Sequence, residues 1–230
     1  AYARSGGKFR IVAGCASGGA ALVVRADAGI AAVKDFEGKK MATPQLGNTQ
    51  DLSARAWLKK NNFKLKEKGG TVRLLPIANP DQLTLFLKKE LDAAWAVEPW
   101  ASRLVSEGNG KIFLDESELW KPVTGGSYAT AVILVSEKFI RGNPELLKKW
   151  LEAHCDLTAW IRAHPAEAMK IVNAQIKQFT GKALPEKVLK DSFARVKFTY
   201  DPIRKSLFQQ GQWAYQEGFL HAKSYLFYGD

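Results

Sequence analysis

The stretch Lys39-Lys-Met-Ala-Thr-Pro-Gln-Leu-Gly-Asn-Thr-Gln-Asp51 passes from a short apolar run, through a polar loop with a glycine, into an amphipathic segment that continues to Asn61. The apolar run favours a strand, and the spacing of Leu52, Ala56 and Leu58 favours a helix. The sequence therefore predicts a strand, a polar glycine loop and a helix in direct succession. A unit of this kind is a building block of α/β folds.

The same alternation continues on both sides of this unit. Strand patterns at residues 71–75 and 91–96 enclose a helix pattern at residues 83–89. Residues 20–25 form an apolar strand pattern, and residues 129–135 form the strongest strand pattern in the chain, after which every pattern is helical. Strands that alternate with helices indicate parallel βαβ units. The strands at 20–25 and 129–135 look able to cross between two lobes.

The length and composition fit a globular protein. With 230 residues, 46% of them hydrophobic, the chain can form one large domain or two modest lobes. No window approaches the roughly 20 apolar residues that a membrane-spanning helix needs, so we expect no stable membrane insertion. Residues 1–10 lack the apolar run of a secretory signal, so the signal of an exported protein would be missing from this sequence.

The net charge is strongly positive. A formal charge of +11 and a pI near 9.6 suggest an anionic partner of some kind. The excess is spread over scattered lysine doublets, however, and no nucleic-acid-binding motif accompanies it. This distribution favours solvated lysines on a protein surface, and we expect no nucleic-acid partner.

Patterns for catalysis, metals and cofactors are weak. Cys15 and Cys155 do not form a CxxC pair, and the histidines are not spaced to bind a metal with them, so we expect no metal and no cofactor. The two cysteines could form one bridge, but we predict two separate thiols. No nucleophile elbow, zinc-protease motif or phosphate-binding loop occurs. Glu116 and Glu118 lie in a polar stretch that predicts a solvated loop.

The loop within residues 43–51 is the first candidate binding element. Backbone N–H groups at a helix start are unpaired, and the helix dipole favours negative charge there, so an oxyanion could bind. The side chains of Asn48, Thr49 and Gln50 could add neutral hydrogen bonds. Alternatively, Asn48 or Thr49 merely caps the helix. Spacing alone leaves both interpretations open.

The second candidate is Ala93-Ala-Trp-Ala-Val-Glu-Pro-Trp100, where Trp95 and Trp100 bracket Glu98 at a predicted strand-to-helix junction. Ligand clefts form at such strand ends in open α/β sheets, and tryptophan can line an apolar slot while its N–H donates. Both rings could instead pack in the core, with Glu98 capping its own helix. A carboxylate would repel an anion, so Glu98 would pair with a cation such as Arg103 or bind the amine of a zwitterion.

Three ordered stretches, residues 35–51, 92–105 and 139–145, resemble the substrate-binding proteins of nitrate/sulfonate/bicarbonate-type ABC transporters. The match runs across nearly the whole chain and is specific for the family but not for the ligand. The resemblance implies a type II periplasmic-binding fold, an α/β clamp of two lobes joined by two crossing strands. Residues 1–32 and 127–230 would form lobe one, and residues 33–126 would form lobe two.

The resemblance also implies an incomplete lobe one, because family members begin with a βαβ segment that precedes the equivalent of Ala1. Ligand contacts would come from the loop at the helix start, from the Glu-Pro element and from the turn at the first crossing. The full expected ligand-binding set is Ser17, Gly18, Gly19, Gln45, Gly47, Asn48, Thr49, Gln50, Trp95, Glu98 and Trp100.

The leading functional hypothesis is a periplasmic or extracytoplasmic solute-binding component of an ABC importer. It would bind a small anionic or zwitterionic ligand, such as an alkanesulfonate or nitrate, and present it to the ABC transporter permease without acting as an enzyme. One alternative is a pyrimidine-synthase-like enzyme of thiamine precursor biosynthesis on the same fold. That enzyme type relies on a histidine donor and a cysteine-rich metal motif, and neither has a counterpart here. The other alternative is a sensor domain.

Overall fold

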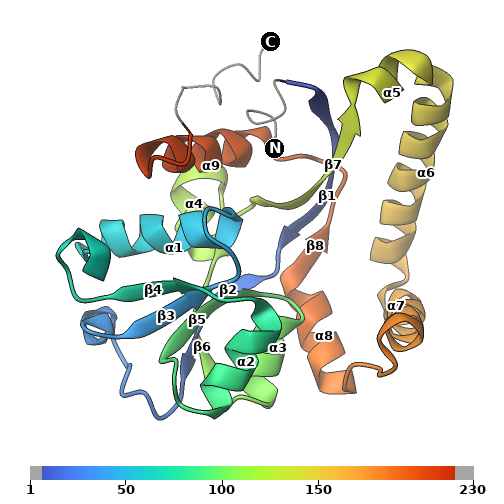
Figure 1. The fold of residues 1–230 in the computed structure, drawn as a ribbon. Helices are drawn as coiled ribbons and strands as arrows, with labels where there is room; N and C mark the ends of the chain where they lie inside the picture. The colour runs from blue at the N-terminus through green and yellow to red at the C-terminus, as the bar shows by residue number, and fades with distance from the viewer. Residues whose placement is uncertain (1–6, 221–230) are drawn as a thin grey trace.

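The computed structural model describes residues 7–220 and shows an α/β protein with two sheets (Figure 1). Five strands form the larger sheet in the order β4-β3-β5-β2-β6, and three form the smaller sheet in the order β7-β1-β8. Val23 and Met41 belong to the larger sheet and Ile133 to the smaller, so no single sheet runs through all three. The α/β class predicted from the alternation of strands and helices is confirmed.

The larger sheet comes from one contiguous part of the chain. β3 is parallel to β4 and β5, whereas β2 is antiparallel to β5 and β6. Its strands are β2 (Ala20–Arg25), β3 (Lys40–Thr43), β4 (Arg73–Pro76), β5 (Ala93–Val97) and β6 (Gly110–Asp115). Its helices are α1 (Thr49–Lys60), α2 (Asn79–Leu87), α3 (Trp100–Ser106) and α4 (Ser117–Thr124), with short 3-10 turns at Val33–Phe36 and Lys66–Lys68.

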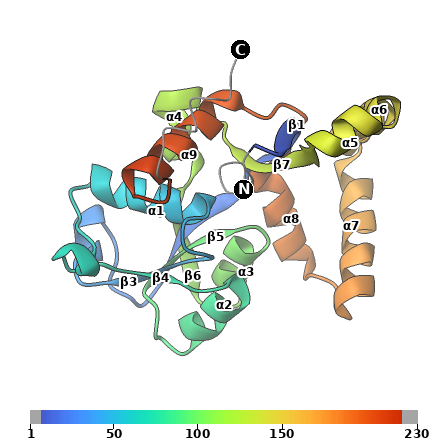
Figure 2. The same ribbon diagram turned by 45° about the horizontal axis from the view of Figure 1, so that its top comes forward.

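Helices cover both faces of the larger sheet, with α1 on one side and α2 and α3 on the other (Figures 1 and 2). The alternation of side chains along β2 follows this arrangement. Leu22 joins the apolar cluster that contains Trp57 of α1, and its neighbour Val23 joins the cluster that contains Leu104 of α3. All six residues of β2 are buried, as expected for a strand that is covered on both faces.

The smaller sheet is built from segments that are distant in sequence. β1 pairs antiparallel with β7, and its last three residues also pair with β8. Its strands are β1 (Phe9–Gly18), β7 (Ala129–Ser136) and β8 (Val196–Phe198). The helices of this part are α5 (Glu137–Gly142), α6 (Pro144–Ala163), α7 (Pro165–Thr180), α8 (Glu186–Arg195) and α9 (Arg204–Gln216). Within residues 7–220, no helix combines the length and apolar character needed to cross a membrane.

The chain passes from the smaller to the larger sheet at Gly18 and Gly19. Both residues have positive φ, +77° and +75°, which glycine adopts without strain. A Cβ atom on Gly18 would lie 2.7 Å from the backbone oxygen of Arg195, and one on Gly19 would lie 2.6 Å from Cγ2 of Val196. The crossing therefore needs glycine twice, for its backbone conformation and for its close contact with the end of α8.

The sheet order corrects the expectation that residues 20–25 cross between the lobes. This strand was expected to cross between lobes as part of lobe one, but as β2 it lies between β5 and β6 of the larger sheet. The long strand β1 leads to the crossing from the smaller sheet. An apolar run alone does not tell whether a strand lies at the crossing or inside the larger sheet. The division of the chain at residues 32 and 126 stays a prediction.

Candidate functional site

The loop before α1 is fixed by Asp51. The Asp51 side chain is 1% exposed, and it accepts hydrogen bonds from Thr43 Oγ1 at 2.9 Å, Gly47 N at 3.0 Å and Arg55 Nε at 2.8 Å. Asn48 Oδ1 accepts from Asp51 N at 2.9 Å, so Asn48 caps the helix. The helix itself thus holds the loop in one conformation. Capping by Asn48 does not exclude anion binding, because it uses only one backbone donor.

The start of α1 offers donors to an anion. Thr49 and Gln50 are the first two residues of the helix, and their N–H groups have no acceptor within it. The helix dipole adds partial positive charge at this end, and Arg55 offsets the charge of Asp51. Gln45 is exposed, Thr49 is half-buried and Gln50 is buried.

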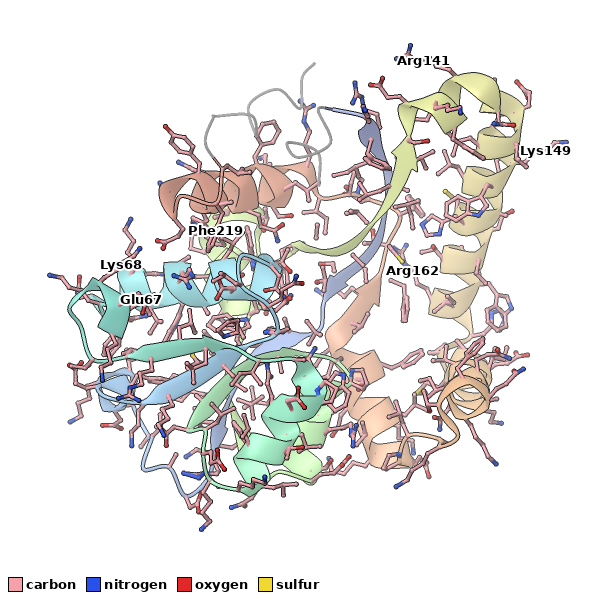
Figure 3. The ribbon with its side chains drawn as sticks, viewed as in Figure 1. Glu67, Lys68, Arg141, Lys149, Arg162 and Phe219 are labelled. Atoms are coloured by element: carbon pink, nitrogen blue, oxygen red, sulfur yellow. The ribbon has the colours of Figure 1, made fainter. Side chains whose placement is uncertain are left out.

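Residues at the end of α9 lie against this loop. Phe219 lies between α9 and α1 (Figure 3), and a Cβ atom on Gly47 would come within 3.3 Å of its ring. The guanidinium of Arg55 lies 5.5 Å from the centre of the same ring and 3.6 Å from Glu217 Oε2. The C-terminal part of the chain therefore forms one wall beside the helix start that the sequence singled out.

Glu98 is held by donors from two parts of the chain. Its side chain is 2% exposed, and its carboxylate accepts from Ser102 N at 3.1 Å, Ser102 Oγ at 3.0 Å and Ser192 Oγ at 3.0 Å. Arg195 Nη1 of α8 completes the set at 2.8 Å. Glu98 N also donates to Gly19 O at 2.7 Å, which places Glu98 beside the crossing between the sheets.

These contacts correct the expectation that a nearby cation such as Arg103 pairs with Glu98. Arg103, suggested by its closeness in sequence, instead forms an ion pair with Glu107, with Nε and Oε1 2.8 Å apart. Arg103 also lies 4.4 Å above the ring of Trp100, which is half-buried on the first turn of α3. Glu98 thus binds a cation from a different helix, and the protein already supplies four hydrogen bonds to its carboxylate.

Trp95 lies in the core and does not line a cleft. The residue is fully buried, and its Nε1 donates to Glu116 Oε2 at 2.5 Å. Glu116 also accepts from Ser53 Oγ at 2.7 Å and from Trp120 Nε1 at 3.1 Å. The alternative interpretation of Trp95 as core packing therefore holds.

Glu116 is likewise not the solvated residue that its polar sequence surroundings suggested. Burial raises the pKa of the Glu116 carboxyl to about 7, although three hydrogen bonds act to lower it. A glutamate flanked by the apolar residues Leu114 and Leu119 was the available sequence signal for burial. Two of its three partners, Ser53 and Trp95, lie on other elements, so their identity was not readable from the local pattern.

A groove whose charged lining is mainly basic opens beside the smaller sheet. Its volume is about 1100 Å³, and Ser17 is the member of the expected ligand set that lines it. Ser17 is 3% exposed, and its Oγ accepts from Tyr128 N at 3.2 Å. The lining includes the charged residues Arg162, Lys190, Lys197, Asp201, Arg204 and Lys205 and the apolar residues Ile161, Met169, Phe193 and Phe198. Residues 45–50 do not belong to this lining.

The expected ligand-binding residues thus lie at different places in the structure. Gly18, Gly19 and Glu98 meet at the crossing, whereas the loop at residues 45–50 lies against the end of α9.

Among residues 7–220, no group of three His, Cys, Asp or Glu side chains is placed to hold a metal ion. Cys15 and Cys155 are both free thiols, which confirms that they are separate.

Comparison with protein families gives one match that covers most of the chain. A model described as the NMT1-like family matches residues 3–176. A search of curated protein sequences finds no match.

Solved structures match over nearly the entire chain. The alkanesulfonate-binding protein SsuA from Xanthomonas axonopodis pv. citri, bound to MOPS, aligns with a TM-score of 0.74 and 17% identity, covering 95% of this chain and 72% of that one. The periplasmic aliphatic sulphonate-binding protein SsuA from Escherichia coli aligns with a TM-score of 0.74 and 18% identity, covering 96% and 68%. The desulfurization enzyme DSZB aligns with a TM-score of 0.65 and 19% identity, covering 95% and 75%. The chain therefore has the fold that these proteins share.

Proposed function

Since the chain belongs to the NMT1-like family, we propose that it is the solute-binding component of an ABC importer and binds a small anionic or zwitterionic ligand. The start of α1 carries this proposal, because two backbone donors without an acceptor in the helix and a helix dipole converge there in a loop held by Asp51. The two SsuA structures, described as sulfonate-binding, support the ligand class through a shared fold. Alkanesulfonates, aminosulfonates and nitrate are the ligands to test first.

In this proposal the two sheets are the cores of two lobes. Gly18 and Gly19 form one connection, and Gly125 and Gly126, also with positive φ, lie in the other. Short glycine connections of this kind can absorb the backbone rotation of hinge closure. The pair between Glu98 and Arg195 then links the end of β5 to α8 across the boundary. Its place there supports a role for Glu98 in holding the lobes, in place of the direct ligand contact that we expected.

The remaining parts of the hypothesis follow from the same role. The partner on the membrane would be an ABC transporter permease, and the protein would act in the periplasm or elsewhere outside the cytoplasm. The positive net charge of the chain would favour capture of anions at low ionic strength.

A second candidate function is an enzyme that acts on a sulfur oxyacid. It is favoured by one observation, the match to DSZB, of which a cysteine-to-serine mutant has been solved in complex with biphenyl-2-sulfinic acid. Fold alone does not separate a binding protein from an enzyme. Cys15 and Cys155 are the thiols that such a reaction could use in this chain. Release of sulfite from an aryl sulfinate, lost in Cys15→Ser or Cys155→Ser, would favour catalysis over transport.

The test of the leading proposal is a thermal-shift screen of propanesulfonate, taurine, nitrate and sulfate, each against sodium chloride at equal ionic strength. A ligand present at about 100 times its dissociation constant should stabilise the folded protein by ~2.7 kcal/mol. Isothermal titration then measures the affinity and stoichiometry of each ligand that raises the melting temperature. A folded protein whose melting temperature responds to none of these anions would contradict the proposal.

A further inference from the structure

Helix α6 is unusually exposed for an apolar helix. It has 20 residues and a length of about 30 Å, but Thr158 is its one buried residue. The exposed fractions of three large apolar residues are 56% for Leu146, 47% for Trp150 and 55% for Leu157. A helix of this length is normally stabilised by burying its apolar side, so these residues suggest a surface that binds something.

Two apolar stripes run along α6, and the body of the protein covers only the first. His154 Nε2 lies 2.8 Å from Gly14 O of β1, and Ile161 lines the groove beside β8, so their side of the helix faces the smaller sheet. The residues of this inner stripe are half-buried or buried and recur at intervals of four and three: Leu147, Leu151, His154, Thr158 and Ile161.

The second stripe is displaced by one residue and is open to solvent. We call it the outer stripe, and its members, all exposed, are Leu146, Trp150, Ala153 and Leu157. Their spacing of four, three and four residues is that of a coiled-coil seam, which a second helix covers. Among residues 7–220, none is placed over this seam to a degree that buries any of the four.

The charges of α6 fit a second copy of the same helix. The chain carries a net charge of +11, so two identical surfaces would usually repel each other. This helix is locally neutral, with three acids and three bases: Glu145, Glu152, Asp156, Lys148, Lys149 and Arg162.

Lys149 and Asp156 decide the direction of the pairing. They lie seven residues apart, hence on the same edge of the outer stripe, and both are exposed. Lys149 projects away from the body of the protein (Figure 3). Neither side chain has an ion-pair partner within the part of the chain that the structure describes. In an antiparallel pair of α6 helices, the edge that carries Lys149 and Asp156 meets the same edge of the partner helix, so Lys149 of each copy lies near Asp156 of the other. In a parallel pair this edge would instead meet the opposite edge of the partner helix, and the two residues would not meet.

The same antiparallel register also matches side-chain sizes. When Leu146 of one copy faces Leu157 of the other, Trp150 faces Ala153, so that each large ring meets the smallest member of the stripe. We propose that a second copy of this chain covers the outer stripe, with the two α6 helices packed antiparallel about a twofold axis and flanked by two Lys149–Asp156 ion pairs. Because one helix per copy makes a small interface, the dimer should be weak and reversible.

The experiment is sedimentation equilibrium of the full chain over a range of protein concentrations at low ionic strength, with circular dichroism to confirm folding. The parent protein should show a monomer–dimer equilibrium. Leu157→Asp should abolish the dimer. Lys149→Asp and Asp156→Lys should each weaken it by about 2- to 30-fold, the range expected for two exposed ion pairs. The double variant K149D/D156K should restore the parent affinity.

Lys148→Asp is the matched control, because Lys148 neighbours Lys149 but lies on the opposite edge of the helix, and this change should leave the dimer intact. Three results would overturn the proposal: a parent protein that stays monomeric at all concentrations, a double variant that stays as weak as the single ones, or a control that dissociates equally. A monomeric protein would assign the outer stripe to a different occupant, such as a further chain segment.

Discussion

The Glu98 carboxylate and the Arg195 guanidinium lie 2.8 Å apart, although 97 positions separate them in sequence. Glu98 follows β5 of the larger sheet, whereas Arg195 ends α8 beside β8 of the smaller sheet. This ion pair thus joins the two parts of the molecule beside the glycine crossing. Because the arginine offsets its charge, the Glu98 carboxylate at this place is compatible with the anionic ligand that we propose.

Loss of the arginine should destabilise the protein more than loss of an ordinary surface cation. Arg195→Ala leaves the 2% exposed Glu98 carboxylate without its counterion, and we expect a cost of about 2–4 kcal/mol. Urea denaturation measures this change. Arg103→Ala is the control, because its partner Glu107 is solvent-accessible, and it should cost less than about 1 kcal/mol. Equal costs for the two variants would contradict the prediction.

Stability should fall as pH rises from about 4.5 to about 7 because of Glu116. Its folded-state pKa, about 7, lies above the ordinary value of 4.5, so the folded protein binds this proton more tightly than the unfolded chain does. The contribution is complete below pH 4.5 and is lost through pH 7, a change of about 3 kcal/mol. Denaturation midpoints measured across this range test the slope. Glu116→Gln should flatten it, whereas exposed Glu118→Gln should leave it unchanged.

Alanine at the crossing should cost more than alanine at an open glycine of the same conformation. Gly19→Ala brings both the strain of positive φ and a 2.6 Å contact with Val196, and Gly181→Ala, at φ +79° with open space around it, brings the strain alone. We expect about 1–2 kcal/mol for Gly181→Ala and a larger loss for Gly19→Ala. Thermal denaturation of the two variants compares them directly. A similar loss in both would mean that the neighbouring side chain yields easily.

Thr49→Ala should weaken binding of an anion that the thermal-shift screen identifies. The variant removes one hydroxyl donor at the start of α1, worth about 0.5–3 kcal/mol, which corresponds to an affinity loss of a few-fold to about a hundredfold. Isothermal titration measures it, with Thr180→Ala at the far end of α7 as the control. Unchanged affinity in Thr49→Ala would leave the loop as a helix cap and move the search for the ligand site elsewhere.

Local sequence patterns predicted the features whose determinants lie within a few residues. The strand, loop and helix around Thr43, Asn48 and Asp51 follow from such patterns because the cap, Asn48, and the donor that it accepts from, the N–H of Asp51, are three positions apart. Local patterns did not predict the contacts of Glu98 and Trp95. Their partners, Arg195 and Glu116, come from other elements, and no spacing rule connects residues so far apart.

Short elements made by tertiary contacts were also beyond local patterns. β8 has only three residues, and it is a strand because it pairs with the last residues of β1. Every sequence pattern after residue 135 is helical, so local spacing does not predict this strand. Helix α4 contains Pro122, and its stretch reads as a loop until packing against α9 is known.

The contiguity of the larger sheet has a consequence for the order of folding. All five of its strands come from residues 20–115, so they can pair as soon as that part of the chain has left the ribosome. β1 must wait, because its partners β7 and β8 are synthesised about a hundred residues or more later. During synthesis β1 therefore exposes unpaired backbone on a nascent chain, and chaperone binding during translation would protect this strand first.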